Sequence, residues 1–398
     1  MNMPAEQIMS TPTLAALLQG YVDAPPLPIS GIASDSRAVE PGYLFLACQG
    51  FTHHGIDYAE AAKAAGAAAI AFDSKTADTP EDIGIPLLAI EHLDRKLGEI
   101  ANRYYDYPSR HLGVFGVTGT NGKTTVAWLI AQCLEMLGKH CGYIGTLGHG
   151  LGELQGAADM TTPATLELHG KLAGFVEASA DFAAVEVSSH ALEQRRVDGV
   201  RFEAALFTNL SRDHLDYHGD MLSYFESKAL LFLDSDTQRR IVDIDTEWGV
   251  ELAARCGADV VAVSTVADRA AVETPHVFVR SVKAEEGGSE ITFDSSWGEG
   301  RLLVPLPGEF NVANAALVLA LLFELGVDRE QACCALSEVS APPGRMQRVS
   351  GRGISAYVDY AHTPDAIESA LLALRGHCRG RLWCVFGCGG ERDAGKRP

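Results

Sequence analysis

Short hydrophobic runs alternate with longer helical patterns along most of the chain. In the first hundred residues, 42–49 predicts a strand, 58–66 an alanine-rich helix and 67–72 a buried strand. The alternation continues from 111 to 341, where it predicts strands at 182–187, 204–208, 240–244 and 260–263 and a β-like piece at 294–304. This order indicates the α/β class, with a mostly parallel sheet covered by helices.

Two proline-containing breaks divide this pattern. Pro108-Ser109 precedes a strand-like run, and Ala341-Pro342-Pro343-Gly344 forms a second linker. We therefore expect three domains, at residues 1–107, 108–341 and 342–398. The third block predicts only a strand, a helix and a strand, at 354–360, 364–374 and 382–386. Because such a unit cannot bury both faces of its sheet, we expect the third domain to be incomplete.

Composition narrows the class of protein. The 398 residues are 47% hydrophobic and carry a formal net charge of −20, which argues against a nucleic-acid partner. The nine cysteines include no C-x-x-C pair, so we expect reduced thiols in a cytoplasmic protein. The amino terminus has no basic signal-peptide region. The longest apolar stretch, 315–323, predicts a buried helix and is too short to span a membrane.

The most informative segment is 112–125, where a strand-like run ends in Gly-Thr-Asn-Gly-Lys-Thr-Thr and leads into a helical pattern. This is the context of a phosphate-binding loop. Gly119 and Gly122 let backbone N–H groups turn toward phosphates, Lys123 can reach the β- and γ-phosphates, and the Thr124 hydroxyl can bind Mg²⁺. An ordinary glycine-rich turn is the weaker alternative. One residue departs from the general phosphate-loop pattern, because Val117 stands where that pattern has glycine.

Polar residues also follow two other predicted strands. Glu186 comes at the end of one, where parallel sheets bind ligands, and it is a candidate Mg²⁺ ligand; Ser188 or Ser189 could instead only cap a helix. In 209–219, which follows the strand at 204–208, the side chains of Asp213, His214 and Asp216 could bind metal or orient phosphate. A solvated loop is the alternative there.

Four further residues leave more than one interpretation. Lys228 lies in a helical pattern, where a lysine is usually a surface residue with a buried stem. Asn311 and Asn314 share one helical face and could meet an adenine edge or cap a helix. Arg345, beside the second linker, is a candidate γ-phosphate clamp.

Taken in order, the motifs resemble the Mur ligases over essentially the whole chain. Beside the phosphate loop, the resemblance rests on Glu186-Val187-Ser188-Ser189-His190, the Asn-Leu-Ser-Arg-Asp-His-Leu-Asp-Tyr-His-Gly run at 209–219 and Glu226-Ser227-Lys228. It also rests on Ser34-Asp35-Ser36-Arg37, Thr161-Thr162-Pro163, Gly344-Arg345-Met346-Gln347 and Asp359-Tyr360-Ala361-His362-Thr363-Pro364. The resemblance is strongest to the branch of the family that adds the third amino acid of the peptidoglycan stem peptide.

The resemblance implies a fold and a reaction. The fold would comprise an amino-terminal UDP-binding α/β domain, a central ATPase domain with a mostly parallel sheet, and a Rossmann-like carboxy-terminal domain that is truncated here. The enzyme would be an ATP-dependent amide-bond ligase acting on UDP-MurNAc-L-Ala-D-Glu through an acyl phosphate, in the cytoplasm and as a monomer. Its cofactors would be ATP, Mg²⁺ and a CO₂-derived carbamate on Lys228.

The resemblance also assigns roles to residues. The implied catalytic residues are Lys123, Lys228, His214 and Arg345, and the implied metal ligands are Thr124, Glu186, His214 and carbamylated Lys228. ATP would contact Gly119, Thr120, Asn121, Gly122, Lys123, Thr124, Thr125, Asn311, Asn314 and His362. The UDP-substrate would contact Ser34, Ser36, Thr161, Thr162, Ser188, Gln194 and Arg196, and the incoming amino acid would contact Arg392.

We expect meso-diaminopimelate as the acceptor, with L-lysine as the alternative, because Arg392 matches a family arginine near the amino-acid carboxylate. The 398 residues contain no Asp-Asn-Pro-Arg motif, which reads diaminopimelate in the family, so we expect this form to bind its substrates but ligate poorly. A folylpolyglutamate synthetase or another Mur ligase is the alternative enzyme. A nucleotide-binding regulatory protein that hydrolyses ATP slowly is the alternative outside enzymes.

Overall fold

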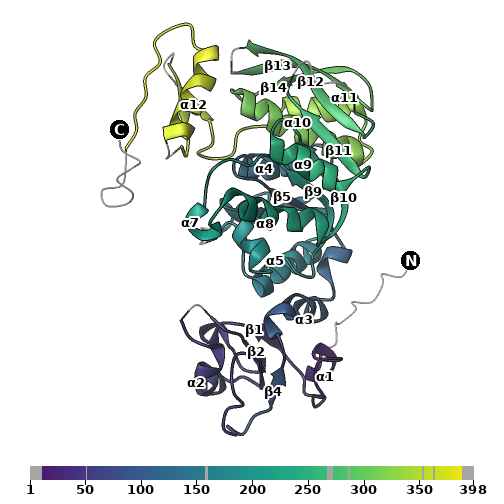
Figure 1. The fold of residues 1–398 in the computed structure, drawn as a ribbon, viewed down its shortest axis with the longest axis vertical. Coiled ribbons are helices and arrows are strands. Elements are labelled where there is room, and N and C mark those ends of the chain that lie inside the picture. The colour runs from purple at the N-terminus through teal and green to yellow at the C-terminus, as the bar shows by residue number, and fades with distance from the viewer. Residues whose placement is uncertain are drawn as a thin grey trace, which may run out of the picture. The chain divides into compact units, whose positions relative to one another are not determined.

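A computed structural model describes residues 11–387, apart from residue 51, 157–159, 267–271, 286, 352–353 and 362–363. The chain divides into two compact units (Figure 1). The first contains residues 1–111, 163–177 and 193–200, and the second contains 112–162, 178–192 and 201–398. The three domain boundaries expected from the sequence stay a prediction. In the described part of the chain, no helix is both long and apolar enough to cross a membrane.

The first unit is built on a parallel sheet with strand order β1-β2-β3-β4 among its described residues. One face packs against α1, α3 and α5, and the other packs against α2. The strands are β1 (Gly31–Ala33), β2 (Tyr43–Ala47), β3 (Ala69–Asp73) and β4 (Leu87–Ile90). The helices are α1 (Leu14–Leu17), α2 (Ala59–Ala64), α3 (Leu97–Tyr104) and α5 (Thr165–Glu177), with 3-10 turns η1 (Ser36–Ala38), η2 (Gly55–Tyr58), η3 (Leu93–Arg95) and η4 (Pro108–Arg110).

The second unit contains a sheet in the order β14-β13-β12-β11-β10-β9-β5-β8-β6-β7 over the described residues. Strands β6 to β12, apart from β7, run parallel to β5. Strand β7 pairs antiparallel with β6, β13 pairs antiparallel with β12, and β14 pairs antiparallel with β13. Their bounds are β5 (Gly113–Thr118), β6 (Cys141–Gly145), β7 (Gly148–Leu151), β8 (Phe182–Glu186), β9 (Arg201–Phe207), β10 (Asp236–Asp243), β11 (Val260–Ser264), β12 (His276–Glu285), β13 (Gly288–Ser295) and β14 (Gly300–Val304). The expected mostly parallel α/β sheet is therefore confirmed.

Helices cover both faces of this sheet. The apolar helix α10 packs with α4 and α11 over one face, because the alternate side chains of β5 and β9 that point there are hydrophobic. Helices α8 and α9 pack against β5, β10 and β11 from the other side, where Phe207 meets Phe232. The helices are α4 (Lys123–Met136), α6 (Ser189–Glu193), α7 (Leu215–His218), α8 (Met221–Leu233), α9 (Glu247–Cys256), α10 (Glu309–Glu324) and α11 (Arg329–Ser337).

The carboxy-terminal elements are an antiparallel hairpin of β15 (Gln347–Gly351) and β16 (Ile354–Val358), followed by α12 (Pro364–His377). The strand and helix expected at 354–360 and 364–374 are confirmed. The strand expected at 382–386 is wrong, because these residues have no regular structure and no strand to pair with. Among the described residues Val385 is 99% exposed, so this apolar run is not buried in the structure.

Candidate active site

The predicted phosphate loop lies between the end of β5 and the start of α4, as its sequence context indicates. Gly119 and Gly122 both have positive φ angles, of 145° and 89°, and a Cβ at Gly119 would lie 1.9 Å from the Thr208 hydroxyl. Asn209 fixes the loop from the neighbouring β9: its carbonyl accepts from the Thr120 N–H at 2.9 Å, and its side-chain oxygen accepts from the Asn121 N–H at 3.0 Å. These two hydrogen bonds therefore fix the loop to the residue that follows the end of β9.

Two lysines meet at a single backbone carbonyl of this loop. The Lys123 amine donates to the carbonyls of Gly119 and Thr120, at 2.9 and 3.0 Å. The Lys228 amine, brought in by α8, donates to the same Gly119 carbonyl at 2.8 Å. Lys228 is only 1% exposed, so it is not the surface lysine that its helical position favours. The structure thus places both lysines at one point beside the phosphate loop.

Burial changes the ionisation of both amines. Desolvation lowers the pKa of Lys123, partly offset by Glu186 and Asp213, and the charge of Arg345 lowers it further. The pKa of Lys228 lies well below its ordinary value, first because of burial and then because of the neighbouring Lys123 charge. Its amine also lies 4.6 Å from the centroid of the Tyr224 ring. Both causes shift the Lys228 amine toward its neutral form, and a neutral amine is a nucleophile.

Glu186 is fully buried at the end of β8, beside the start of α4. Its Oε2 accepts from the Thr124 hydroxyl at 2.9 Å and from the Thr146 hydroxyl at 3.2 Å. Its Oε1 accepts from the Tyr143 hydroxyl and from the Thr146 N–H, the latter at 3.0 Å. The structure thus brings together Thr124 and Glu186, two oxygen ligands expected to bind Mg²⁺.

The 209–219 segment lies next to the loop; Asp213, His214 and Asp216 are exposed, whereas the His218 ring is buried and lies 2.9 Å from the Ser189 hydroxyl. His214 has a positive φ of 53°, and its Nε2 lies 3.5 Å from the Asp213 carboxylate. The His214 ring is 6.1 Å from the ring of Tyr224, the same ring that Lys228 approaches. His214 therefore lies on the Lys228 side of the site, while Asp216 is exposed in α7.

Asn311 and Asn314 are buried near the phosphate loop. The Asn311 amide donates to the Pro307 carbonyl at 2.8 Å, and the Asn314 amide donates to the Asn311 side-chain oxygen at 3.3 Å. A Cβ built at Gly122 would lie 2.5 Å from the Asn314 side-chain oxygen. The described contacts therefore link α10 to the loop, and the contact with adenine stays a prediction.

Three of the residues expected to bind the UDP-substrate lie in the second unit. The Thr162 hydroxyl is buried, donates to the Glu186 carbonyl at 2.8 Å and accepts from the Ser188 N–H at 3.0 Å. The Ser188 hydroxyl accepts from the Ala191 N–H at 3.2 Å, so Ser188 does cap α6. Thr161 is half-buried and lies 3.4 Å from the Thr146 hydroxyl. Thr162 thus supports the local structure, whereas Thr161 is accessible to a ligand.

The other expected substrate residues belong to the first unit. Ser34 follows β1 directly and is exposed, and Ser36 begins η1, which Asp35 caps. They lie at the carboxyl end of a parallel strand, where ligands bind in such sheets. The Gln194 side chain accepts from the Arg196 guanidinium at 3.0 Å.

Two expected residues, His362 and Arg392, lie outside the described residues. Arg345 stacks on the Tyr360 ring, with its guanidinium carbon 4.5 Å from the ring centroid. No sequence pattern indicated a role for Tyr143 or Thr146, and Asn209 stood out only as part of the 209–219 motif. Tyr143 and Thr146 belong to no recognisable motif, so only the pairing of β6 with β8 reveals that they are part of the site.

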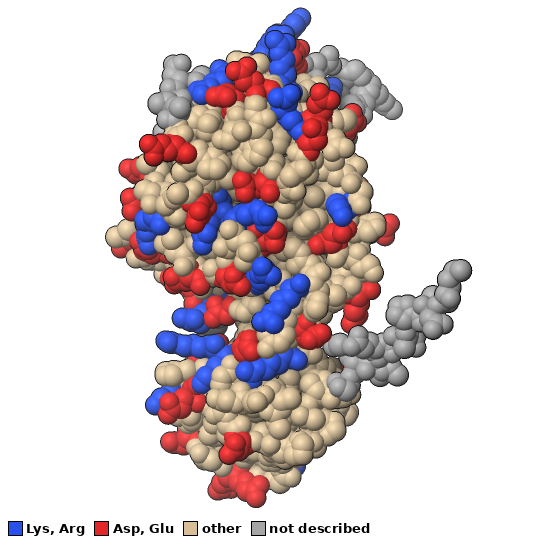
Figure 2. Space-filling view, turned by 90° about the vertical axis from the view of Figure 1, so that its right-hand side faces the viewer, with Lys and Arg blue, Asp and Glu red and all other residues tan. Residues whose placement is uncertain are grey.

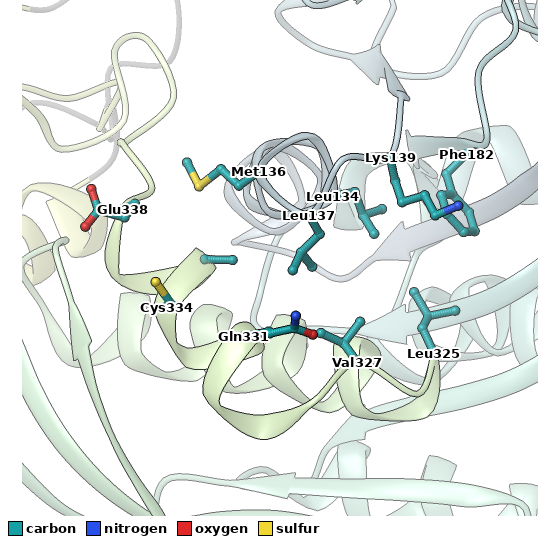
Figure 3. Close-up of a pocket in the computed structure, with 11 residues that line it drawn as sticks. Leu134, Met136, Leu137, Lys139, Phe182, Leu325, Val327, Gln331, Cys334 and Glu338 are labelled. Carbon is teal, nitrogen blue, oxygen red and sulfur yellow. The ribbon is translucent and has the colours of Figure 1, made fainter.

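A distinct open cavity of about 800 Å³ lies at the far end of α4 (Figure 3). Leu134, Leu137, Phe182, Leu325 and Val327 give it an apolar lining. Helix α4 has 14 residues, so this cavity is about 20 Å from the phosphate loop at the other end. It is therefore separate from the residues described above.

Comparisons with known proteins agree with the site. The family domain described as "Mur ligase middle domain" matches residues 117–322, "Mur ligase family, catalytic domain" matches 28–105, and "Mur ligase, glutamate ligase domain" matches 344–398. A UDP-N-acetylmuramoyl-L-alanyl-D-glutamate–2,6-diaminopimelate ligase of Coxiella burnetii is 43% identical over 93% of this chain and 76% of its own length. The protein of that name from Pseudomonas aeruginosa is 42% identical over 93% of this chain and 75% of its own length.

Solved structures give the same result. The structure of a UDP-N-acetylmuramoyl-L-alanyl-D-glutamate–2,6-diaminopimelate ligase matches with a TM-score of 0.78 and 32% identity, over 97% of this chain and 79% of the other. MurF from Acinetobacter baumannii, at 20% identity, shares the fold with a TM-score of 0.66, over 91% of this chain and 76% of the other. With a family domain matching more than half of its residues and relatives above 40% identity over nearly its whole length, the chain belongs to the Mur ligase family.

Proposed function

We propose that this protein is the ATP-dependent ligase that joins 2,6-diaminopimelate to UDP-MurNAc-L-Ala-D-Glu in peptidoglycan precursor synthesis. The D-glutamate side-chain carboxylate attacks the γ-phosphorus of ATP, and ADP leaves. The amine of the amino acid then attacks the acyl carbon, an amide bond forms and phosphate leaves. The observation that carries the proposal is the meeting of Lys123 and Lys228 at the Gly119 carbonyl, in a chain whose relatives bear this ligase name.

The reaction brings together two anions, a carboxylate and a triphosphate, on a protein with a formal net charge of −20. On the face drawn in Figure 2, Lys and Arg side chains lie among Asp and Glu side chains rather than in one basic area. We infer that cations at the site itself attract the two substrates. Lys123 supplies one of them, and Arg345 is proposed to supply a second at the γ-phosphate.

The donor atoms also fit Mg²⁺. The Thr124 hydroxyl and the Glu186 carboxylate, 2.9 Å apart, are hard oxygen ligands beside the phosphate loop. Among the described residues, no group of three or more His, Cys, Asp or Glu could hold a metal ion, so the proposed ligand set also needs hydroxyl and carbamate oxygens. Bound Mg²⁺ would neutralise charge on the phosphates. Glu186, Thr124, His214 and modified Lys228 are the proposed residues that hold it.

Modification of Lys228 follows from its environment. A neutral amine adds to the carbon of CO₂, which forms an N–C bond, releases one proton and leaves a carbamate. This change turns a buried group with a suppressed positive charge into an oxygen ligand that a cation can use. It also removes the repulsion between two ammonium groups at one carbonyl.

A coupled assay tests the proposal. Phosphate release from ATP should require both UDP-MurNAc-L-Ala-D-Glu and an amino acid, and the product should gain the mass of one diaminopimelate residue. L-Lysine in place of diaminopimelate is the comparison that checks the acceptor. If the rate of ATP turnover does not depend on the UDP-substrate, the result supports a regulatory nucleotide-binding protein instead. If ATP turnover requires a folate substrate, the result supports a folylpolyglutamate synthetase.

A further inference from the structure

The Thr146 hydroxyl, just after β6, lies between a proposed metal ligand and a proposed substrate residue. It is 3.2 Å from Glu186 Oε2 and 3.4 Å from the Thr161 hydroxyl. Thr146 is exposed, whereas Glu186 is fully buried, so the hydroxyl stands where the buried carboxylate meets the accessible part of the site. No motif marks Thr146, and the proposed function gives it no role.

A hydroxyl group has one proton, so Thr146 can donate to only one of these two partners at a time. The bond to the carboxylate is charge-assisted and is the stronger one when Glu186 binds no cation. In that state the Thr146 proton is not donated to the Thr161 oxygen, which is the acceptor in the contact between the two hydroxyl groups. The direction of the Thr161 proton is then not fixed by Thr146.

The hydrogen bonds of Glu186 leave little spare capacity. A carboxylate has about four lone-pair positions, and Glu186 accepts from Tyr143, Thr124 and twice from Thr146. Gly145 closes the Oε1 side, because a Cβ there would lie 2.2 Å from this oxygen. A cation that binds Oε2 must therefore displace the proton of Thr124 or of Thr146.

We propose that Thr146 is a positioning residue that couples cation binding at Glu186 to substrate binding at Thr161. When a cation takes its place on Oε2, the Thr146 proton turns to the Thr161 oxygen. The Thr161 proton is then directed to an acceptor on the UDP-substrate. This inference rests on the proposed function, and it predicts that Mg²⁺ and the UDP-substrate strengthen each other's binding.

Calorimetric titration with UDP-MurNAc-L-Ala-D-Glu tests the coupling without turnover, in Mg²⁺ or in EDTA, each with a non-hydrolysable ATP analogue. For the wild type we expect Mg²⁺ to lower the Kd about tenfold, within the usual range of such couplings. Thr146→Val keeps the backbone N–H that holds Glu186 but removes the hydroxyl. Thr146→Val should abolish the effect of Mg²⁺ on the Kd, and so should Thr161→Val. The double variant should behave like either single variant.

Two variants are matched controls. Thr146→Ser keeps the hydroxyl and should keep the Mg²⁺ dependence. Tyr143→Phe removes another hydrogen bond to Glu186 but does not touch Thr161, and it too should keep the dependence. Retention of the full dependence by Thr146→Val, or its loss in Tyr143→Phe as well, would overturn the coupling role. If the wild type binds the UDP-substrate equally well with and without Mg²⁺, this inference alone is overturned. If the wild type does not bind the UDP-substrate at all, the proposed function is overturned as well.

Discussion

At the scale of single residues, the arrangement of Lys123 and Lys228 combines two effects. Each amine donates to the Gly119 carbonyl, so each has a hydrogen-bond acceptor although both are removed from bulk water. Two ammonium groups this close repel one another, and the more deeply buried Lys228 is the one whose charge is suppressed further. This difference agrees with the proposed roles of Lys123 as a cation for phosphates and of Lys228 as the amine that takes up CO₂.

Replacing Lys123 tests the first of these roles. Lys123→Ala should reduce ATP-dependent turnover by at least about 10²-fold, the usual loss for one charge-stabilising donor. The melting temperature should change little, because the amine contacts only carbonyls of its own loop. Lys63→Ala, at an exposed position of α2, is the control. Turnover like that of the wild type in a folded Lys123→Ala protein would refute the phosphate-loop role.

Replacing Lys228 tests the second role. Lys228→Ala should lose activity to a similar degree, because both the carbamate and its metal contact disappear. Added formate or acetate should restore part of this activity, since a small carboxylate can enter the space and supply the missing oxygens. Mass spectrometry of the native protein should also find the added CO₂ on this lysine. No effect of any carboxylate, combined with an unmodified Lys228 in a metal-loaded structure, would contradict the carbamate.

At the scale of elements, the start of α4 and the start of α10 are joined by a contact that excludes any side chain at Gly122. Gly122 has a φ of 89°, and a Cβ there would be 2.5 Å from the Asn314 side-chain oxygen. Gly138, just after the other end of α4, has a φ of 75° but no atom within 4 Å of such a Cβ. A comparison of substitutions at Gly122 and Gly138 therefore distinguishes the cost of backbone strain from the cost of disturbing the contact with α10.

Alanine at these two positions should have different effects. Gly138→Ala should cost about 1–2 kcal/mol of unfolding free energy from the left-handed backbone alone. Gly122→Ala should cost more than this and should also weaken ATP binding, because Asn314 or the loop must move. Urea unfolding and nucleotide titration of both variants measure the two effects. Equal losses of stability, with unchanged ATP affinity, would show that the α10 contact does not matter.

The elements that carry the site were predictable because their local signals agree. The phosphate loop, β8, β9 and the apolar α10 all follow from hydrophobic pattern and glycine placement, and all are present. The hairpins β6–β7 and β12–β13 were not predicted. The sequence also favoured a strand at 382–386, because an apolar run does not reveal whether a partner strand exists. Tyr143 and Thr146 were not predicted for a related reason: their position beside Glu186 depends on the pairing of β6 with β8, which are 36 residues or more apart along the chain.

At the scale of the whole molecule, the first compact unit is assembled from three separate stretches of chain. The Asn102 side chain donates to the Gly199 carbonyl at 2.8 Å, and His169 of α5 bonds through Nε2 to the Asp198 carbonyl at 3.0 Å. Leu166 completes the core cluster on which α3 packs. Residues 163–177 and 193–200 therefore contribute to the stability of a unit whose sheet, among the described residues, is formed by residues 31–90.

His169 makes this unit sensitive to acid. Because the Asp198 carbonyl can only accept, Nε2 of His169 carries the proton, and Nδ1 is buried with no hydrogen-bond partner among the described residues. Burial accordingly lowers the pKa of His169 below its ordinary value of 6.5. The unfolded chain therefore binds a proton more readily than the folded one, and folding stability falls as the pH drops below about 6.5 toward the lower folded pKa.

Unfolding followed between pH 8 and pH 5 tests this whole-molecule effect, with pH values chosen about one to two units on either side of the histidine pKa. The loss of unfolding free energy on acidification should be smaller in His169→Gln, whose amide can still donate to the Asp198 carbonyl but cannot take up a proton. His53→Gln, at an exposed position of the same unit, should retain the wild-type pH dependence. A pH dependence in His169→Gln equal to that of the wild type would show that other groups cause the acid sensitivity.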